Sequence, residues 1–342
     1  AFGQTGCGKT TSFIYPNLQK RLELGHGILL YDYKGKEHLS VKYLAEQIGR
    51  LDDVVEVGKP WGENINIIQN MDEDELDKFF DNILKHGDDN KYWQNSAKSL
   101  GQSILKMLKA IEVFSNAMCL VEKNFLAANK EIRAKEFSFP THRTLSSMLK
   151  VCKTFEDLEN FIKSLESLTR KTQNIIDSSI QKILARKKSN IKLYKNKYKT
   201  VLSAHTKLIS IIDDTKDALD SFGEKSNENL TQNIMGSLTA PLLSLSQSLY
   251  FNENEFDIVK ALGEGKIIIL NTEALSTAAV ESLNNVIMYE LSKRTKNSNI
   301  HPVSIFIDEV QRVVSRSTDF PIDVFREAKV DLFLATQNSA LL

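Results

Sequence analysis

The chain has 342 residues, 42% of them hydrophobic, and its 44 Lys and Arg side chains balance its 44 Asp and Glu side chains. This length can bury one large core or two of ordinary size, and the balanced charge leaves no overall field that would attract nucleic acid. Three widely separated cysteines argue against a disulfide framework and favour reduced thiols in a cytosolic compartment. The apolar runs are far shorter than the ~20 residues that span a bilayer.

The sequence opens with a phosphate-binding loop, GQTGCGKT at residues 3–10. Its glycines allow backbone N–H groups to turn toward phosphate oxygens, Lys9 can reach the β- and γ-phosphates of a nucleotide, and the Thr10 hydroxyl can ligate Mg²⁺. The helix that begins near Lys9 adds the positive end of its dipole. We therefore predict that ATP and Mg²⁺ bind at Gly3, Gln4, Thr5, Gly6, Cys7, Gly8, Lys9, Thr10 and Thr11.

Compact apolar runs predict strands at 27–35, 265–272, 303–309 and 330–337. Such near-continuous runs are typical of strands that are covered on both faces, as in a parallel sheet. Helix-sized stretches such as 278–294 lie between them. The pattern predicts an α/β fold with a parallel sheet built from βαβ units.

The stretch 102–222 has no glycine and one proline, which indicates helix. Apolar residues recur there at spacings of three and four, in a seam that His205 interrupts and in a second stripe. The seam comprises Ile191, Tyr194, Tyr198, Val201, Leu208 and Ile212, and the stripe comprises Leu158, Phe161, Ile162, Leu165 and Leu168. We predict an inserted all-α domain at 75–235 between two parts of a nucleotide-binding domain, 1–74 and 236–342.

Polar residues end two of the predicted strands, where an open α/β sheet binds its ligands. Asp308 can hold Mg²⁺, and Glu309 can orient or deprotonate the attacking water. Gln337 can contact both the γ-phosphate and that water, or can be an ordinary polar residue that leaves a strand. Arg326 can be an arginine finger, or can pair with Glu327 or Asp323 at the surface.

A basic stretch lies within the predicted insertion. Between residues 161 and 207 there are twelve Lys and Arg against two acids, Glu166 and Asp177, so the local charge is 12 − 2 = +10. With Tyr194 and Tyr198 interleaved, this stretch can neutralise phosphates and stack on bases. It can also be the solvated outer face of a helical bundle, and we favour that interpretation.

Together these motifs resemble the coupling proteins of type IV secretion and conjugation systems, ring-forming ATPases related to FtsK-like and HerA-like DNA translocases. LLYDYKGKE at 29–37 resembles the second strand of that family, WGENIN at 61–66 its Asn-containing turn, and KYWQNSAKSLGQSIL at 91–105 the start of its all-α domain. GKIIILNT, SIFIDE and FREAKVDLFLATQ then follow in the family's order. The chain departs from the family at Tyr33, where a proline is common, and in its longer, lysine-rich insertion.

The resemblance implies a RecA-like sheet in a motor that hydrolyses ATP and drives DNA, secreted proteins or both into a type IV secretion channel. The implied location is the cytoplasmic face of the bacterial inner membrane, and the implied partners are single- or double-stranded DNA, other channel subunits, and adaptor proteins on the all-α domain. The implied site has catalytic Lys9, Glu309 and Gln337, Mg²⁺ ligands Thr10 and Asp308, and Arg326 acting across the interface of a homo-hexamer. Because only Ala1 and Phe2 precede the loop, we expect a fragment, which can be monomeric.

Two other functions stay open. The chain can be the assembly ATPase that energises the same secretion machine without contacting DNA. It can also be a protein-docking module in which the nucleotide is only a switch. Cargo binding distinguishes the first from the coupling motor, and turnover stimulated by single-stranded DNA distinguishes the second.

Overall fold

The structure, a computed structural model, divides the chain into two compact units. Unit 1 comprises Ala1–His86 and Leu243–Leu342, and unit 2 comprises Gly87–Leu242. The predicted domain bounds of 75–235 stay a prediction, and each unit is described by itself below. The described residues are 1–3, 8–69, 71–84, 91–125, 143–185, 191–223, 228–246, 256–273, 275, 277–294, 301–313 and 321–337.

Unit 1 contains a five-stranded parallel sheet, so the predicted α/β parallel-sheet fold is confirmed. The strand order is β2-β3-β1-β4-β5. The strands are β1 (Gly27–Asp32), β2 (Val54–Val57), β3 (Ile267–Asn271), β4 (Val303–Asp308) and β5 (Val330–Ala335). β2 and β3 pair directly although unit 2 lies between them in sequence, so the insertion leaves the sheet continuous.

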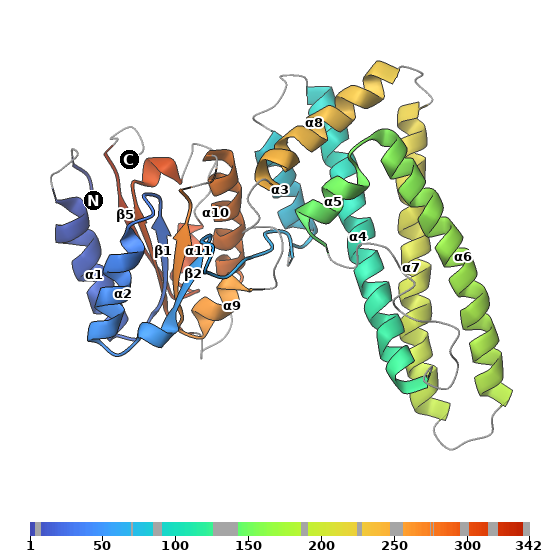
Figure 1. The fold of residues 1–342 in the computed structure, drawn as a ribbon, viewed down its shortest axis with the longest axis horizontal. Coiled ribbons are helices and arrows are strands. Elements are labelled where there is room, and N and C mark those ends of the chain that lie inside the picture. The colour runs from blue at the N-terminus through green and yellow to red at the C-terminus, as the bar shows by residue number, and fades with distance from the viewer. Residues whose placement is uncertain are drawn as a thin grey trace. The chain divides into compact units, whose positions relative to one another are not determined.

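The central strands are apolar because helices cover both faces of the sheet. Every residue of β1 and of β3 is buried. On one face the sheet packs against α1 (Tyr15–Glu23) and α2 (Glu37–Gln47), and on the other against α9 (Ile258–Gly263) and α10 (Thr277–Ser292), as Figure 1 shows. The Tyr31 hydroxyl donates a 2.8 Å hydrogen bond to Asn284 of α10, which fixes this second layer.

Helix α3 (Glu73–Leu84) belongs to unit 1, where it packs on α10. Asp72 and Glu75 cap the start of α3 reciprocally, each accepting from the other's backbone N–H at 2.9 and 2.7 Å. Lys293, at the end of α10, lies 2.7 Å from Asp72, 3.0 Å from Glu75 and 3.9 Å from Glu290. A charged cluster therefore ties the start of α3 to α10.

Unit 2 is helical, with α4 (Lys91–Phe125) and α6 (Phe155–Ala185) each packed against α7 (Ile191–Gly223), as Figure 1 shows. The short α5 (Leu145–Val151) joins α4 to α6 through contacts with both. Val201, Leu208 and Ile212 are buried, which confirms the predicted seam at these positions; the side chains of Ile191, Tyr194 and Tyr198 lie outside the described residues.

His205 does not interrupt the seam as the sequence suggested, because it is buried within it. Its imidazole is 1% exposed, packs 5.5 Å from the Phe114 ring, and bonds through Nε2 to the Thr169 carbonyl at 3.0 Å. A satisfied ring nitrogen makes this burial tolerable, since a buried polar group without a partner is costly.

The remaining elements are short, apart from α8, within which the chain passes in sequence from unit 2 to unit 1. They are α8 (Glu228–Ser246), α11 (Ile322–Phe325), a π-helical turn at Thr10–Ile14, and 3-10 turns at Leu51–Asp53 and Val310–Arg312. Among the helices that the structure describes, none combines the length and the hydropathy needed to cross a membrane.

The sheet core predicts a strong response to truncation at Phe306. This side chain is fully buried on β4 and stacks on Phe333 with ring centroids 4.6 Å apart. Phe306→Ala should lower the free energy of unfolding by ~3–5 kcal/mol, because it removes buried surface and leaves a cavity. Urea denaturation would measure the loss, with Tyr43→Ala as control because Tyr43 is 61% exposed on α2. Similar losses in the two variants would contradict the packing.

The charged cluster predicts a pH-dependent contribution to stability. Burial, reinforced by the neighbouring Glu75 carboxylate, raises the pKa of Glu290 from 4.5 to about 7. A raised pKa stabilises the folded state at low pH, and this contribution is lost as the pH rises through about 7. Glu290→Gln should therefore lose less stability than the parent chain between pH ~5 and ~8. The exposed Glu264→Gln is the control, and parallel stability profiles for all three proteins would contradict the shift.

Candidate nucleotide-binding site

The phosphate loop begins beside β5. Residues 1–3 run parallel to the end of that strand: the Thr336 N–H donates to the Ala1 carbonyl at 3.0 Å, and the Gly3 N–H donates to the Thr336 carbonyl at 3.3 Å. The predicted site residues Gln4, Thr5, Gly6 and Cys7 lie outside the described residues. The carboxyl end of β5 and the start of the loop therefore lie at the same edge of the sheet.

The loop returns at Gly8 and leads directly into a helix. Gly8 has a φ of 81°, a left-handed conformation that glycine adopts without a steric penalty. The Ser12 N–H donates to the Gly8 carbonyl at 2.7 Å, and the Thr11 hydroxyl donates to the same carbonyl at 3.1 Å. A π-helical turn at Thr10–Ile14 continues into α1, so the positive end of a helix dipole lies beside the loop and favours an anion.

Lys9 and Thr10 point toward different parts of the site. The Lys9 ammonium donates to the Gly3 carbonyl at 2.5 Å, which holds it across the loop. The Thr10 hydroxyl donates to Asp308 Oδ2 at 2.5 Å. The start of the helix and the carboxyl end of β4 are therefore in direct contact, although 298 positions separate the two residues.

Glu309 follows β4 and has an uncommon backbone conformation. Its φ of 65° and ψ of 56° are left-handed, which costs a non-glycine residue ~1–3 kcal/mol. Its carboxylate Oε1 lies 2.8 Å from the Lys34 ammonium and accepts from the Gln337 amide at 3.4 Å. The structure thus brings Gln337 and Glu309 together at the ends of β5 and β4.

Lys34 was not among the predicted site residues. It follows β1, in the LLYDYKGKE stretch, and its hydrogen bond to Glu309 raises the pKa of its ammonium, which therefore stays charged at neutral pH. A single lysine in a polar turn carries no sequence signal for this contact, because the contact depends on the alignment of β1 with β4.

Arg326 lies apart from the other predicted residues. It is exposed and precedes β5 by four positions, whereas Asp308, Glu309 and Gln337 lie at the carboxyl ends of β4 and β5. Because β4 and β5 are parallel, Arg326 precedes the amino end of β5, which is opposite to the sheet edge where the site acids lie. A role for Arg326 on this chain's own nucleotide gains no support from this position, and a role across a subunit interface stays a prediction.

The residues present fit a Mg²⁺–nucleotide. The hydroxyl of Thr10 and the carboxylate of Asp308 are hard oxygen donors, which Mg²⁺ prefers, and they already lie within 2.5 Å of each other. The Lys9 ammonium and the helix start supply positive charge for phosphates. Lys9, Thr10 and Asp308 could therefore hold the metal and the phosphates together.

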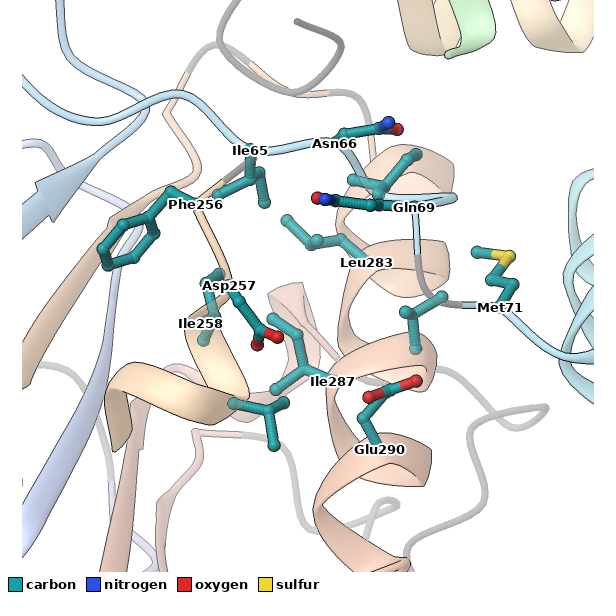
Figure 2. A pocket seen from close by; sticks show the side chains of 13 residues that line it. Ile65, Asn66, Gln69, Met71, Phe256, Asp257, Ile258, Leu283, Ile287 and Glu290 are labelled. Carbon is teal, nitrogen blue, oxygen red and sulfur yellow. The ribbon is translucent and has the colours of Figure 1, made fainter. Parts of the chain in front are cut away.

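A concavity in unit 1 is separate from this cluster. It is lined by residues 65–67, 69 and 71, the start of α9, and α10, with Asp257 and Glu290 among mainly apolar side chains, as Figure 2 shows. None of its lining residues is a predicted site residue. Its described walls are mainly apolar and carry two carboxylates, which suit a nucleotide phosphate poorly.

Comparison with known proteins yields similarities of fold. No protein-family model and no curated protein sequence matches the chain. The plasmid coupling protein TrwB in complex with ADP and Mg²⁺ is similar over 94% of this chain and 66% of that chain, with 12% identity and a TM-score of 0.42. TrwB with a non-hydrolysable ATP analogue gives the same coverage, 11% identity and a TM-score of 0.41. VirB4 of Thermoanaerobacter pseudethanolicus is similar over 98% of this chain and 68% of that chain, with 12% identity and a TM-score of 0.41.

The solved structures thus include coupling proteins, the family that the sequence motifs resemble. The chain spans slightly less than two thirds of the TrwB chain. The function proposed below rests on the residues of the site rather than on these similarities.

Proposed function

We propose that this chain is the nucleotide-hydrolysing part of a secretion or conjugation ATPase. The observation that carries the proposal is the convergence of Lys9 and Thr10 with Asp308 and Glu309 at one edge of a parallel sheet. Phosphoryl transfer to water requires a phosphate-binding loop, a hydroxyl and a carboxylate that hold the metal, and a further acid that activates the water. The chain has each of these parts, and the further acid follows the metal-binding carboxylate by one residue.

Each residue would have a distinct role in hydrolysis. Lys9 would bind the β- and γ-phosphates, and Thr10 with Asp308 would hold Mg²⁺, which neutralises developing phosphate charge when bound. Glu309 would accept a proton from the attacking water, and Gln337 would orient that water through its carboxamide. Arg326 would act on the nucleotide of a neighbouring subunit in a homo-hexamer.

We further propose that the hydrolysis drives DNA, secreted proteins or both into a type IV secretion channel at the inner membrane, as a coupling protein. Unit 2 would recognise the cargo or an adaptor protein. The support is the basic stretch at 161–207, whose described parts lie on α6 and α7. Arg170, Lys171, Lys199 and Lys207 of this stretch are exposed.

Hydrolysis by the full chain tests the site. Lys9→Ala should lower kcat/KM at least ~100-fold, because the phosphates lose their ammonium. Glu309→Gln should lower kcat by ~100-fold while MgADP affinity is kept, because it removes a general base and no binding group. Lys20→Ala is the control, since Lys20 is an exposed lysine of α1 whose ion pair with Glu23 lies at the surface. Equal rates in all four proteins would reject the assignment.

DNA stimulation distinguishes the coupling motor from its alternatives. Single-stranded DNA should raise the turnover several-fold at low salt, and the effect should weaken as salt increases. Alanine at Arg170, Lys171, Lys199 and Lys207 should abolish the stimulation and leave basal turnover unchanged, whereas alanine at Lys106 and Lys109, exposed on α4, should not. Turnover without stimulation would favour the assembly ATPase, and binding of nucleotide with negligible turnover would favour a switch.

A further inference from the structure

The Glu309 carboxylate is held from both strands that flank β4. Lys34 follows β1 by two positions and Gln337 follows β5 by two positions, and the sheet order places β4 between these strands. Both side chains meet the same oxygen, Oε1, at 2.8 and 3.4 Å, and neither contact uses Oε2. The contacts thus fix the carboxylate while they leave its second oxygen for another ligand.

The turn that carries Lys34 is capped by one buried carboxylate. Asp32 is fully buried at the end of β1, and its carboxylate accepts from the backbone N–H groups of Lys36 at 3.1 Å and His38 at 3.3 Å. Gly35 has a φ of 67°, and a Cβ there would lie 2.2 Å from Glu273 Oε2. The Asp32 cap and the left-handed backbone of Gly35 therefore shape the turn that carries Lys34.

The same turn is connected to the helix that follows the phosphate loop. The hydroxyl of Tyr15, the first residue of α1, donates a hydrogen bond to Glu37, the first residue of α2. Burial and this hydrogen bond raise the pKa of Tyr15 to about 12, so the hydroxyl stays a donor at neutral pH. The turn 33–36 thus connects β1 to Glu37, the residue that accepts the hydrogen bond from α1.

We propose that Lys34 is a positioning residue that holds the Glu309 carboxylate in its productive orientation for water activation. The proposal rests on the proposed function, since it assigns Lys34 to the same site. The three rotatable bonds of a glutamate side chain allow many orientations, and a carboxylate misplaced by ~1 Å can cost ~100-fold in rate. Lys34 restricts these orientations from the β1 side, as Gln337 does from the β5 side.

A purely stabilising role explains the contact less well. The Lys34 side chain is 51% exposed and that of Glu309 is 15% exposed. Ion pairs with one such exposed partner contribute little to folding stability. Glu309 nevertheless has a strained backbone conformation and directly follows β4. At this position the orientation of its carboxylate explains the contact better than a gain in stability does.

Kinetics of the full chain separate positioning from binding. Lys34→Met should lower kcat by ~10–100-fold with KM for ATP and MgADP affinity within about twofold, because only the reacting geometry changes. Lys34→Arg should restore most of the rate. Lys36→Met, which removes an exposed lysine two positions away in the same turn, is the matched control. Equal kcat in the Lys34→Met and Lys36→Met variants, or a raised KM at constant kcat, would overturn the proposal.

A measurement without turnover tests the ion pair itself. Acylation of lysines by an N-hydroxysuccinimide ester, followed by mass spectrometry, should label Lys34 several-fold more slowly than Lys36, because a paired, protonated amine is a poor nucleophile. Glu309→Gln should remove this protection and leave the Lys36 rate unchanged. Fast labelling of Lys34 in the parent chain would overturn the proposal whether or not the chain hydrolyses ATP. A protected Lys34 in a chain with no turnover would instead reject the proposed function alone.

Discussion

The hydrogen bond between Thr10 and Asp308 is the contact on which the rest of the site depends. It joins the start of the helix after the phosphate loop to the carboxyl end of β4, and it spans almost the whole sequence. A parallel sheet makes this possible, because its carboxyl ends meet at one edge however much chain lies between the strands. Without this contact the loop and the acids would be unrelated features of one chain.

The sheet also explains how a large insertion and a precise site coexist. β2 and β3 pair in register, from Val54 with Ile267 to Val57 with Leu270, although unit 2 lies between them in sequence. The other strands carry the site, with Asp308 at the end of β4 and Lys34, Glu309 and Gln337 just after β1, β4 and β5. The left-handed backbone at Glu309 costs stability, and the Lys34 and Gln337 contacts hold the carboxylate that this backbone carries.

Much of the fold could be predicted because the strands are buried on both faces and read as apolar runs, as in ILLYD of β1 and SIFID of β4. The contact of Lys34 with Glu309 could not, because it depends on a strand register that no local pattern encodes. The cluster of Lys293 with Asp72 and Glu75 has no sequence signal for a similar reason, because it joins residues that are far apart in sequence. His205 looked like a break in the seam because its partner, a backbone carbonyl of α6, has no sequence signal.

The proposed function requires that one metal–nucleotide binds between the loop and the end of β4. The most direct measurement is the anomalous-scattering position of Mn²⁺ in crystals of the full chain grown with a non-hydrolysable ATP analogue. The expected peak lies between the Thr10 hydroxyl and the Asp308 carboxylate, with the γ-phosphate facing Glu309. A peak bound to neither Thr10 nor Asp308, or an analogue bound away from Lys9, would contradict the claim.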